Sequence, residues 1–88
     1  MLDYVFTNQF KKSLKLMEKR HYKMDEIYEI ITMIIWKEPL PERCREHRLS
    51  GDYEGFTECH ALNNVLVVYI LDEEKVIFVN IGTHSDLF

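Results

Sequence analysis

Hydrophobic residues recur at helical spacing early in the chain, at Phe10, Leu14 and Met17. This spacing predicts an amphipathic helix over residues 8–20, because side chains three and four positions apart lie on one helix face. Thr7 or Asn8 carries the short polar side chain that caps the start of a helix. The outward face of this predicted helix is basic.

A second helical stripe follows and consists of isoleucines: Ile27, Ile30, Ile31, Ile34 and Ile35. These positions fit the i, i+3, i+4, i+7, i+8 pattern and predict a helix over residues 25–37 that buries the stripe. Asp25 is suited to cap its first turn. Pro39 and Pro41 stop the helix, and residues 38–50 have no hydrophobic period and predict a surface connection.

Runs rich in β-branched and aromatic residues predict a first strand over residues 2–6 and three later strands over residues 56–61, 65–71 and 75–81. The turns between the later strands, at residues 63–64 and 72–74, are short. Short turns join antiparallel neighbours, so the second half of the chain is expected to form an antiparallel meander.

The predicted order of elements is β-α-α-β-β-β, with no repeat and no linker. Two helices ahead of a meander predict an α+β fold of two layers, in which both helices pack on one face of an antiparallel sheet. A length of 88 residues predicts a single domain over residues 1–88.

Composition excludes several classes of protein. Hydrophobic residues make up 47% and charged residues 30% of the chain, which is typical of a globular protein. No apolar run approaches the roughly 20 residues of a membrane span, and the N-terminus does not resemble a signal peptide. We therefore expect a cytoplasmic protein in which Cys44 and Cys59 are reduced thiols.

The net charge of −4 is divided unevenly along the chain. Residues 1–50 hold ten Lys and Arg against eight Asp and Glu, a net +2, whereas residues 51–88 hold one against seven, a net −6. A lysine-rich run that includes Lys11 and Lys15 is either a solvated helix face or a patch that binds RNA. A second basic group follows at Arg43, Arg45 and Arg48.

Histidines and a carboxylate gather in the second half of the chain. Alternation along a strand places Glu58 and His60 on one face, with Cys59 on the other. His47 lies just before the meander and His84 just after it, so both can reach the sheet. The spacings match no established zinc pattern, and neither a metal site nor a cofactor is expected.

This set of side chains suits general acid-base cleavage of RNA. A base removes the proton of a ribose 2′-hydroxyl, the oxygen attacks the adjacent phosphorus, and an acid protonates the leaving 5′-oxygen. Our hypothesis assigns Glu58 or His60 as the base and His84 as the acid. His47, together with Arg48 or Arg45, would hold the phosphate. Such chemistry needs no metal.

Several blocks of sequence resemble YafQ-type toxins of the RelE/ParE superfamily, at residues 47–51, 55–56, 58–60, 65–69 and 82–88. The resemblance implies a RelE-like α+β fold and a ribosome-dependent mRNA endonuclease of a type II toxin-antitoxin system. It also implies a heteromeric complex with a cognate antitoxin, for which the basic face of the first helix is a suitable landing site.

The resemblance carries over residue by residue. His47, His60 and His84 match family histidines implicated in RNA cleavage, Glu58 matches an acidic position, and Phe88 matches a C-terminal aromatic residue at the active site. Many relatives carry an acidic residue where this chain has Asn64, and an amide cannot take up a proton at neutral pH.

Two other functions stay open at this point. A ParE-like relative would poison DNA gyrase by binding and would have no nuclease activity. A degenerate toxin would keep only antitoxin binding. The grouping of histidines with Glu58 favours the nuclease, whereas Asn64 and the acidic net charge keep the degenerate toxin open.

Overall fold

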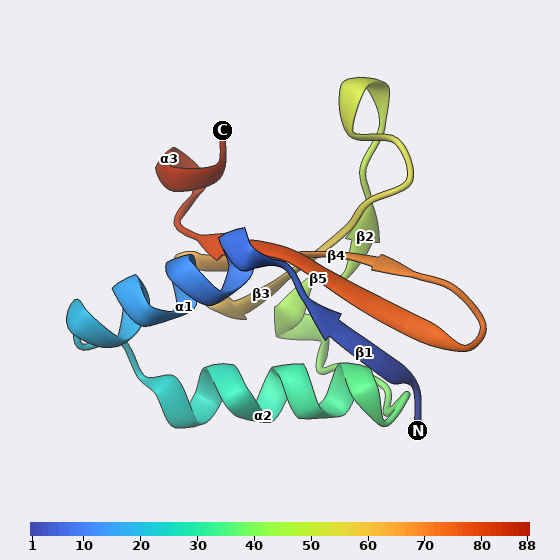
Figure 1. The fold of residues 1–88 in the computed structure, drawn as a ribbon, viewed down its shortest axis with the longest axis horizontal. Helices are drawn as coiled ribbons and strands as arrows, with labels where there is room; N and C mark the ends of the chain where they lie inside the picture. Colours follow the sequence, from blue (N-terminus) through green and yellow to red (C-terminus); the bar gives the residue numbers. More distant parts are fainter.

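A five-stranded sheet in the order β1-β5-β4-β3-β2 organises the computed structural model, which describes all of residues 1–88 (Figure 1). The strands are β1 (Asp3–Phe6), β2 (His47–Arg48), β3 (Thr57–Leu62), β4 (Val65–Leu71) and β5 (Lys75–Gly82). Strands β3, β4 and β5 are antiparallel neighbours. The expected α+β fold and its meander are therefore confirmed.

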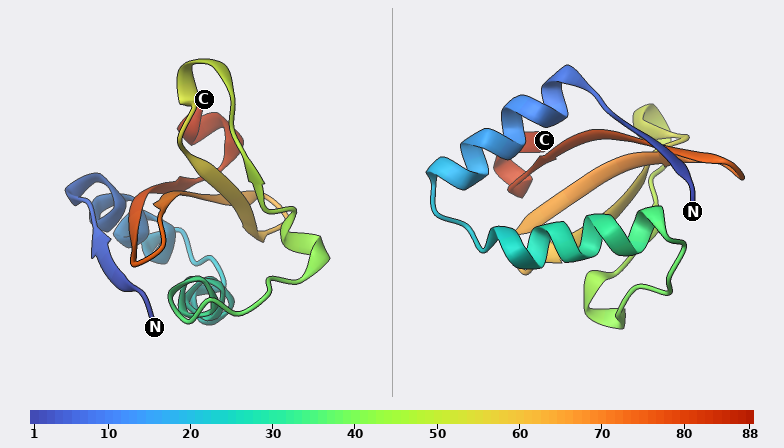
Figure 2. Two further views of the ribbon diagram at one scale, coloured as in Figure 1. Left: turned by 90° about the vertical axis from the view of Figure 1, so that its right-hand side faces the viewer. Right: turned by 60° about the horizontal axis from the view of Figure 1, so that its bottom comes forward.

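Helices α1 (Asn8–Lys19) and α2 (Met24–Ile35) lie on the same side of the sheet (Figure 2). Thr7 caps α1 as expected, because its hydroxyl accepts a hydrogen bond from the backbone N–H of Phe10. The prediction of Asp25 as the cap of α2 is wrong. That helix begins one residue earlier, after Lys23, and Asp25 lies in its first turn near the positive end of the helix dipole.

The sheet is mixed, which corrects the expected antiparallel sheet. Strand β1 runs parallel to β5, with Asp3 opposite Lys75 and Phe6 opposite Phe78. Helices α1 and α2 follow β1 and form the long connection that a parallel pairing requires. The strand periodicity predicted β1 itself but carried no information about its partner.

Two short elements were not predicted. Strand β2 has two residues, and helix α3 (His84–Leu87) has four, so neither shows a hydrophobic period. Two 3-10 turns, η1 (Glu42–Cys44) and η2 (Gly51–Tyr53), flank β2. The observed order is therefore β-α-α-β-β-β-β-α, with β2 formed inside the expected surface connection.

The two faces of the sheet have different roles. The inner face packs on the isoleucine stripe of α2 and supplies Cys59, Ala61, Val67, Tyr69 and Phe78 to the core. Because side chains alternate along a strand, Glu58, His60, Leu66 and Val68 belong to the outer face. Helix α3 and the segment around η2 rise from that outer face (Figure 1).

A residue with left-handed backbone geometry lies two positions after the end of each long helix. His21 follows α1 with φ of 61°, and Lys37 follows α2 with φ of 59°. The N–H groups of Lys37 and Glu38 bond the carbonyls of Ile34 and Met33, which satisfies two carbonyls of the last turn of α2. No helix in the structure is both long enough and apolar enough to cross a membrane.

Candidate active site

A histidine and a carboxylate face each other on the outer face of the sheet. Strands β2 and β3 pair antiparallel with His47 opposite Glu58, and His47 Nε2 lies 3.6 Å from Glu58 Oε1. Glu58 is the one buried charged residue of the chain, whereas His47 is about half exposed. A buried carboxylate requires a partner, and the only side chain paired with it is the His47 imidazole.

The hydrogen bond at the other ring nitrogen fixes the tautomer of His47. Its Nδ1 lies 2.7 Å from the carbonyl oxygen of Arg45. A carbonyl oxygen only accepts, so Nδ1 carries the proton and donates it. The second nitrogen, Nε2, then carries the lone pair and faces the Glu58 carboxylate. This pair therefore has the features of a proton acceptor.

A second contact anchors His47 from the core side. The hydroxyl of Tyr69 donates a hydrogen bond to the carboxylate of Glu46, the residue next to His47. Burial raises the pKa of Tyr69 well above its ordinary value, which keeps the hydroxyl protonated and a donor. Sequence reasoning missed this contact, because no pattern marks Glu46 as the partner of Tyr69.

The two cysteines do not supply a nucleophile. Cys44 and Cys59 are buried and free. Burial raises the pKa of Cys59 to about 12, so its thiol is protonated at neutral pH and is unreactive.

His60 lies two residues after Glu58 on β3, on the same face of the sheet. It faces Leu66 of β4, and Leu66 faces Gly82 of β5. At about 4.8 Å per strand, the Cα atoms of His60 and Gly82 are about 10 Å apart. Because α3 starts two residues after Gly82, the topology brings His84 to the end of the sheet that carries His60.

Helix α3 is held over the sheet by three features. Thr83 and Asp86 form a reciprocal capping box, and Asp86 makes a 3.1 Å salt bridge with Arg20 at the end of α1. A Cβ atom at Gly82 would lie 2.8 Å from the Cβ of Asp86, so only glycine allows this close approach. These contacts position His84 and Phe88.

Aromatic rings line the space beneath α3. The rings of Tyr53 and Phe88 meet edge to face at 5.1 Å, and the ring of His84 lies 5.3 Å from that of Phe88. Tyr53 and Phe88 line a cavity of about 120 Å³, which is also lined by Val68 on the outer face of the sheet. The side chain of Tyr53 is partly exposed beside Phe88.

The structure does not gather all the cationic candidates at this site. Arg48 follows His47 on β2, so its side chain points to the other side of the strand, where it lies with Thr57 and Leu71. Lys11 and Lys15 lie on the flank of α1 that faces Tyr28 of α2, on the helical side of the sheet. Arg45 is exposed and contributes its carbonyl to His47.

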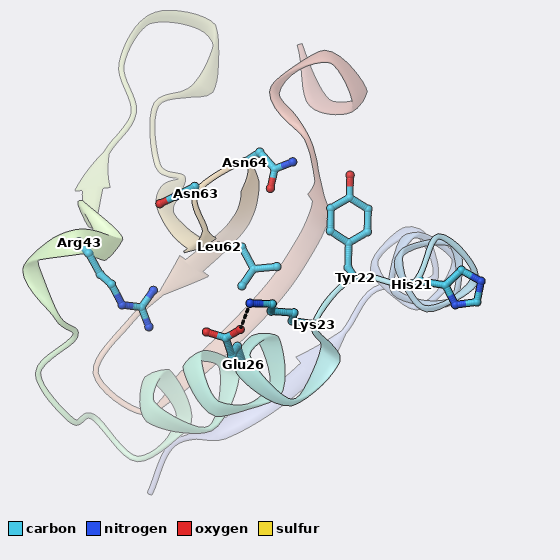
Figure 3. Close-up of a pocket in the computed structure, with 8 residues that line it drawn as sticks. All are labelled: His21, Tyr22, Lys23, Glu26, Arg43, Leu62, Asn63 and Asn64. Atoms are coloured by element: carbon cyan, nitrogen blue, oxygen red, sulfur yellow. Dashed lines mark ion pairs between the residues drawn. The ribbon is translucent and has the colours of Figure 1, made fainter.

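Asn64 lies in the turn between β3 and β4. It lines a second cavity of about 470 Å³, on the helical side of that turn, together with Tyr22, Lys23 and Arg43 (Figure 3). No group of three or more His, Cys, Asp or Glu side chains anywhere in the structure is arranged to hold a metal ion.

Comparison with known proteins gives one consistent result. A family described as "Bacterial toxin of type II toxin-antitoxin system, YafQ" matches residues 2–88. The mRNA interferase toxin YafQ of Escherichia coli K12 is 31% identical over 87 residues, which cover 98% of this chain and 95% of that protein.

Solved structures agree with this match. YafQ in the E. coli DinJ-YafQ toxin-antitoxin complex superposes with a TM-score of 0.91 at 31% identity, covering 99% of this chain and 97% of that one. A copper-bound mutant toxin from Helicobacter pylori has a TM-score of 0.92 at 30% identity, with both chains fully covered. The chain belongs to the YafQ family of toxins of type II toxin-antitoxin systems.

Proposed function

We propose that this toxin is a ribosome-dependent mRNA endonuclease in which residues 1–88 act as a single domain. The observation that carries the proposal is the His47–Glu58 pair, which lies beside His60 on the outer face of the sheet. The relative from E. coli K12 is named an mRNA interferase, which supports the same activity here.

In the proposed reaction the base is the His47–Glu58 pair, so His47 takes the role that the sequence-based hypothesis gave to Glu58 or His60. This pair removes the proton of a ribose 2′-hydroxyl. The freed oxygen attacks the adjacent phosphorus, and the bond from phosphorus to the 5′-oxygen of the next nucleotide breaks. His84 donates a proton to that leaving oxygen. His60 donates a hydrogen bond to the phosphorane that forms during the reaction. The products are a 2′,3′-cyclic phosphate and a 5′-hydroxyl end.

The aromatic residues orient the substrate in this proposal. Tyr53 and Phe88 present partly exposed rings beside His84. Single-stranded RNA is commonly held by stacking of its bases on such rings. A base held there would place the adjoining phosphate toward the histidines.

No step of the proposed reaction passes through a metal. The H. pylori relative was solved with copper, but no three donor side chains gather here to hold an ion. Ribosomes need magnesium to stay assembled, so they are cross-linked in its presence before EDTA is added. Cleavage should then persist in EDTA. Loss of cleavage that returns with added Cu²⁺ or Zn²⁺ would contradict this part of the proposal.

We expect a cognate antitoxin to neutralise the toxin in the cytoplasm. The E. coli relative is seen bound to DinJ, and the present chain shares its fold over nearly its whole length. Co-expression with the cognate antitoxin, followed by purification on a tag placed on the antitoxin, should yield a stable heteromeric complex.

The primary test is induced expression without antitoxin, with primer extension on a reporter mRNA. We expect growth arrest and ribosome-dependent cuts that are lost in His60→Ala and His84→Ala. His21→Asn is the matched control, because it removes an imidazole outside the site and asparagine tolerates left-handed geometry. Arrest without cuts would indicate a binding poison of the gyrase type, and no arrest would indicate a toxin that only binds its antitoxin.

A further inference from the structure

The cavity beside the β3–β4 turn is built from three segments that are distant in sequence. Its walls are the connection between α1 and α2, the η1 turn and the β3–β4 turn, and its volume is about 470 Å³. Figure 3 shows the side chains of Lys23 and Arg43 directed into this space, with the ring of His21 directed away from it. The cavity is separate from the aromatic one beneath α3.

The charges of the cavity favour an anion. The Arg43 guanidinium makes one weak hydrogen bond, 3.5 Å from its Nη1 to the carbonyl of Ala61, which leaves most of its five N–H donors unused. Lys23 has one carboxylate partner, Glu26, at 3.8 Å. Two cations therefore face one carboxylate in this cavity.

The cavity and the candidate active site share one wall. His60 Nδ1 lies 3.3 Å from the carbonyl oxygen of Asn63. The same turn presents the Asn63 and Asn64 amides at the rim of the cavity, and amide N–H groups donate to phosphate oxygens. The β3–β4 turn therefore contacts His60 and also lines the cavity.

We propose that this cavity binds a backbone phosphate of RNA next to the cleavage site, with Arg43 as its principal ligand and Lys23 as its second cation. The proposal rests on the proposed function, since it adds a second contact to the same RNA. A guanidinium with free N–H groups matches the two oxygens of a phosphodiester. The phosphate belongs either to the mRNA or to ribosomal RNA, which share this chemistry.

The test compares Arg43→Gln, Arg43→Lys and Lys23→Gln with Lys37→Gln. This control removes one positive charge just after the C-terminal end of α2, whereas Lys23 precedes its N-terminal end. One assay measures binding of a fluorescent single-stranded RNA with 2′-O-methyl riboses, which cannot undergo 2′-hydroxyl attack. A second assay measures binding to ribosomes without mRNA. Thermal melts of all four variants check that they fold.

We expect Arg43→Gln to weaken one of the two RNA interactions about tenfold. The slope of the logarithm of the binding constant against the logarithm of the salt concentration should become shallower by about 0.7, the value for one phosphate on a single strand. Lys23→Gln should have a smaller effect in the same assay. Arg43→Lys should keep the slope, and Lys37→Gln should match the wild type. The oligonucleotide assay assigns the phosphate to mRNA, and the ribosome assay assigns it to ribosomal RNA.

Equal behaviour of Arg43→Gln and Lys37→Gln in both assays would overturn the proposal, as would a lack of wild-type binding in both. Neither assay requires cleavage. If the toxin binds RNA through Arg43 but does not cut mRNA, this inference stands and the proposed nuclease activity is refuted.

Discussion

The imidazole Nε2 of His47 lies 3.6 Å from Oε1 of Glu58, across the β2–β3 pair. Arg45 accepts a hydrogen bond from the opposite nitrogen of the same ring, so His47 can take up a proton only on the side of Glu58. The two residues are therefore expected to act as one unit.

A double-mutant cycle tests this unit. His47→Gln and Glu58→Gln should each lower the rate of mRNA cleavage by about 100-fold or more, the usual contribution of a general base. The double variant should be no worse than the poorer single variant, because residues that act as a unit are not additive. Single-turnover cleavage on ribosomes gives the rates. Losses that multiply in the double variant would show that the two residues act independently.

Tyr69→Phe should lower both stability and activity, although Tyr69 lies on the core face. The variant leaves Glu46 without its hydroxyl partner, which should cost about 1 kcal/mol of unfolding free energy. It should also loosen the segment that carries His47 and so lower cleavage.

The control for Tyr69→Phe is Glu46→Gln, whose amide oxygen still accepts from the Tyr69 hydroxyl. Urea denaturation and the ring signals of His47 by NMR separate the two effects. Unchanged His47 signals in Tyr69→Phe would contradict the anchoring role.

The hydrophobic pattern was sufficient to predict the layers of this fold. The isoleucine stripe of α2 and the alternation along β3 are local signals, and each element formed close to its expected bounds. The parallel pairing of β1 with β5 depends on how the helices cross the sheet, which no local pattern encodes. A two-residue strand and a four-residue helix are too short to show a period.

The candidate site was only partly predictable for the same reason. Alternation correctly placed Glu58 and His60 on one face, and it also separates Arg48 from His47 once β2 is recognised as a strand. The side-chain contact between Tyr53 and Phe88 joins segments 35 positions apart in the sequence and follows only from the docking of α3.

Gly82→Ala should disturb α3 more than it disturbs the core. The new methyl group would lie 2.8 Å from the Cβ of Asp86, so the helix that carries His84 must shift. A displacement of about 1 Å at a catalytic group lowers the rate by about 100-fold. Cleavage should fall by about this factor with little change in melting temperature. Ser85→Ala, an exposed change within α3, is the control, and equal activities of the two variants would contradict the prediction.

Lys37→Gly should stabilise the protein without altering cleavage. Lys37 has φ of 59°, a geometry that costs a residue with a side chain about 1 kcal/mol and that glycine adopts freely. The free energy of unfolding in urea should rise by about that amount. Lys37→Ala keeps a Cβ atom in the same geometry and should give no gain, so equal stabilisation by both variants would point to the lost charge instead.

Acid should release α3 through Asp86. The hydrogen bonds from the backbone and side chain of Thr83, with a smaller contribution from Arg20, lower the pKa of Asp86 below its ordinary value of 3.8. Folding lowers the pKa of this carboxylate, so the carboxylate stabilises the folded protein at pH values above the pKa of the unfolded chain. This stabilisation is lost as the pH falls through the lowered pKa of the folded protein. The position of α3 should therefore be constant from pH 8 to pH 5 and should change only below about 3.8.

The measurement is the pH dependence of the NMR signals of the Phe88 ring, which contacts Tyr53 only while α3 is docked. Asp86→Asn should remove the acid transition from these signals. Asp72→Asn is the matched control, because backbone hydrogen bonds from Glu74 and Lys75 also lower the pKa of Asp72, but in the distant β4–β5 turn. A transition that persists in Asp86→Asn and disappears in Asp72→Asn would show that acid acts on the sheet and not on the cap of α3.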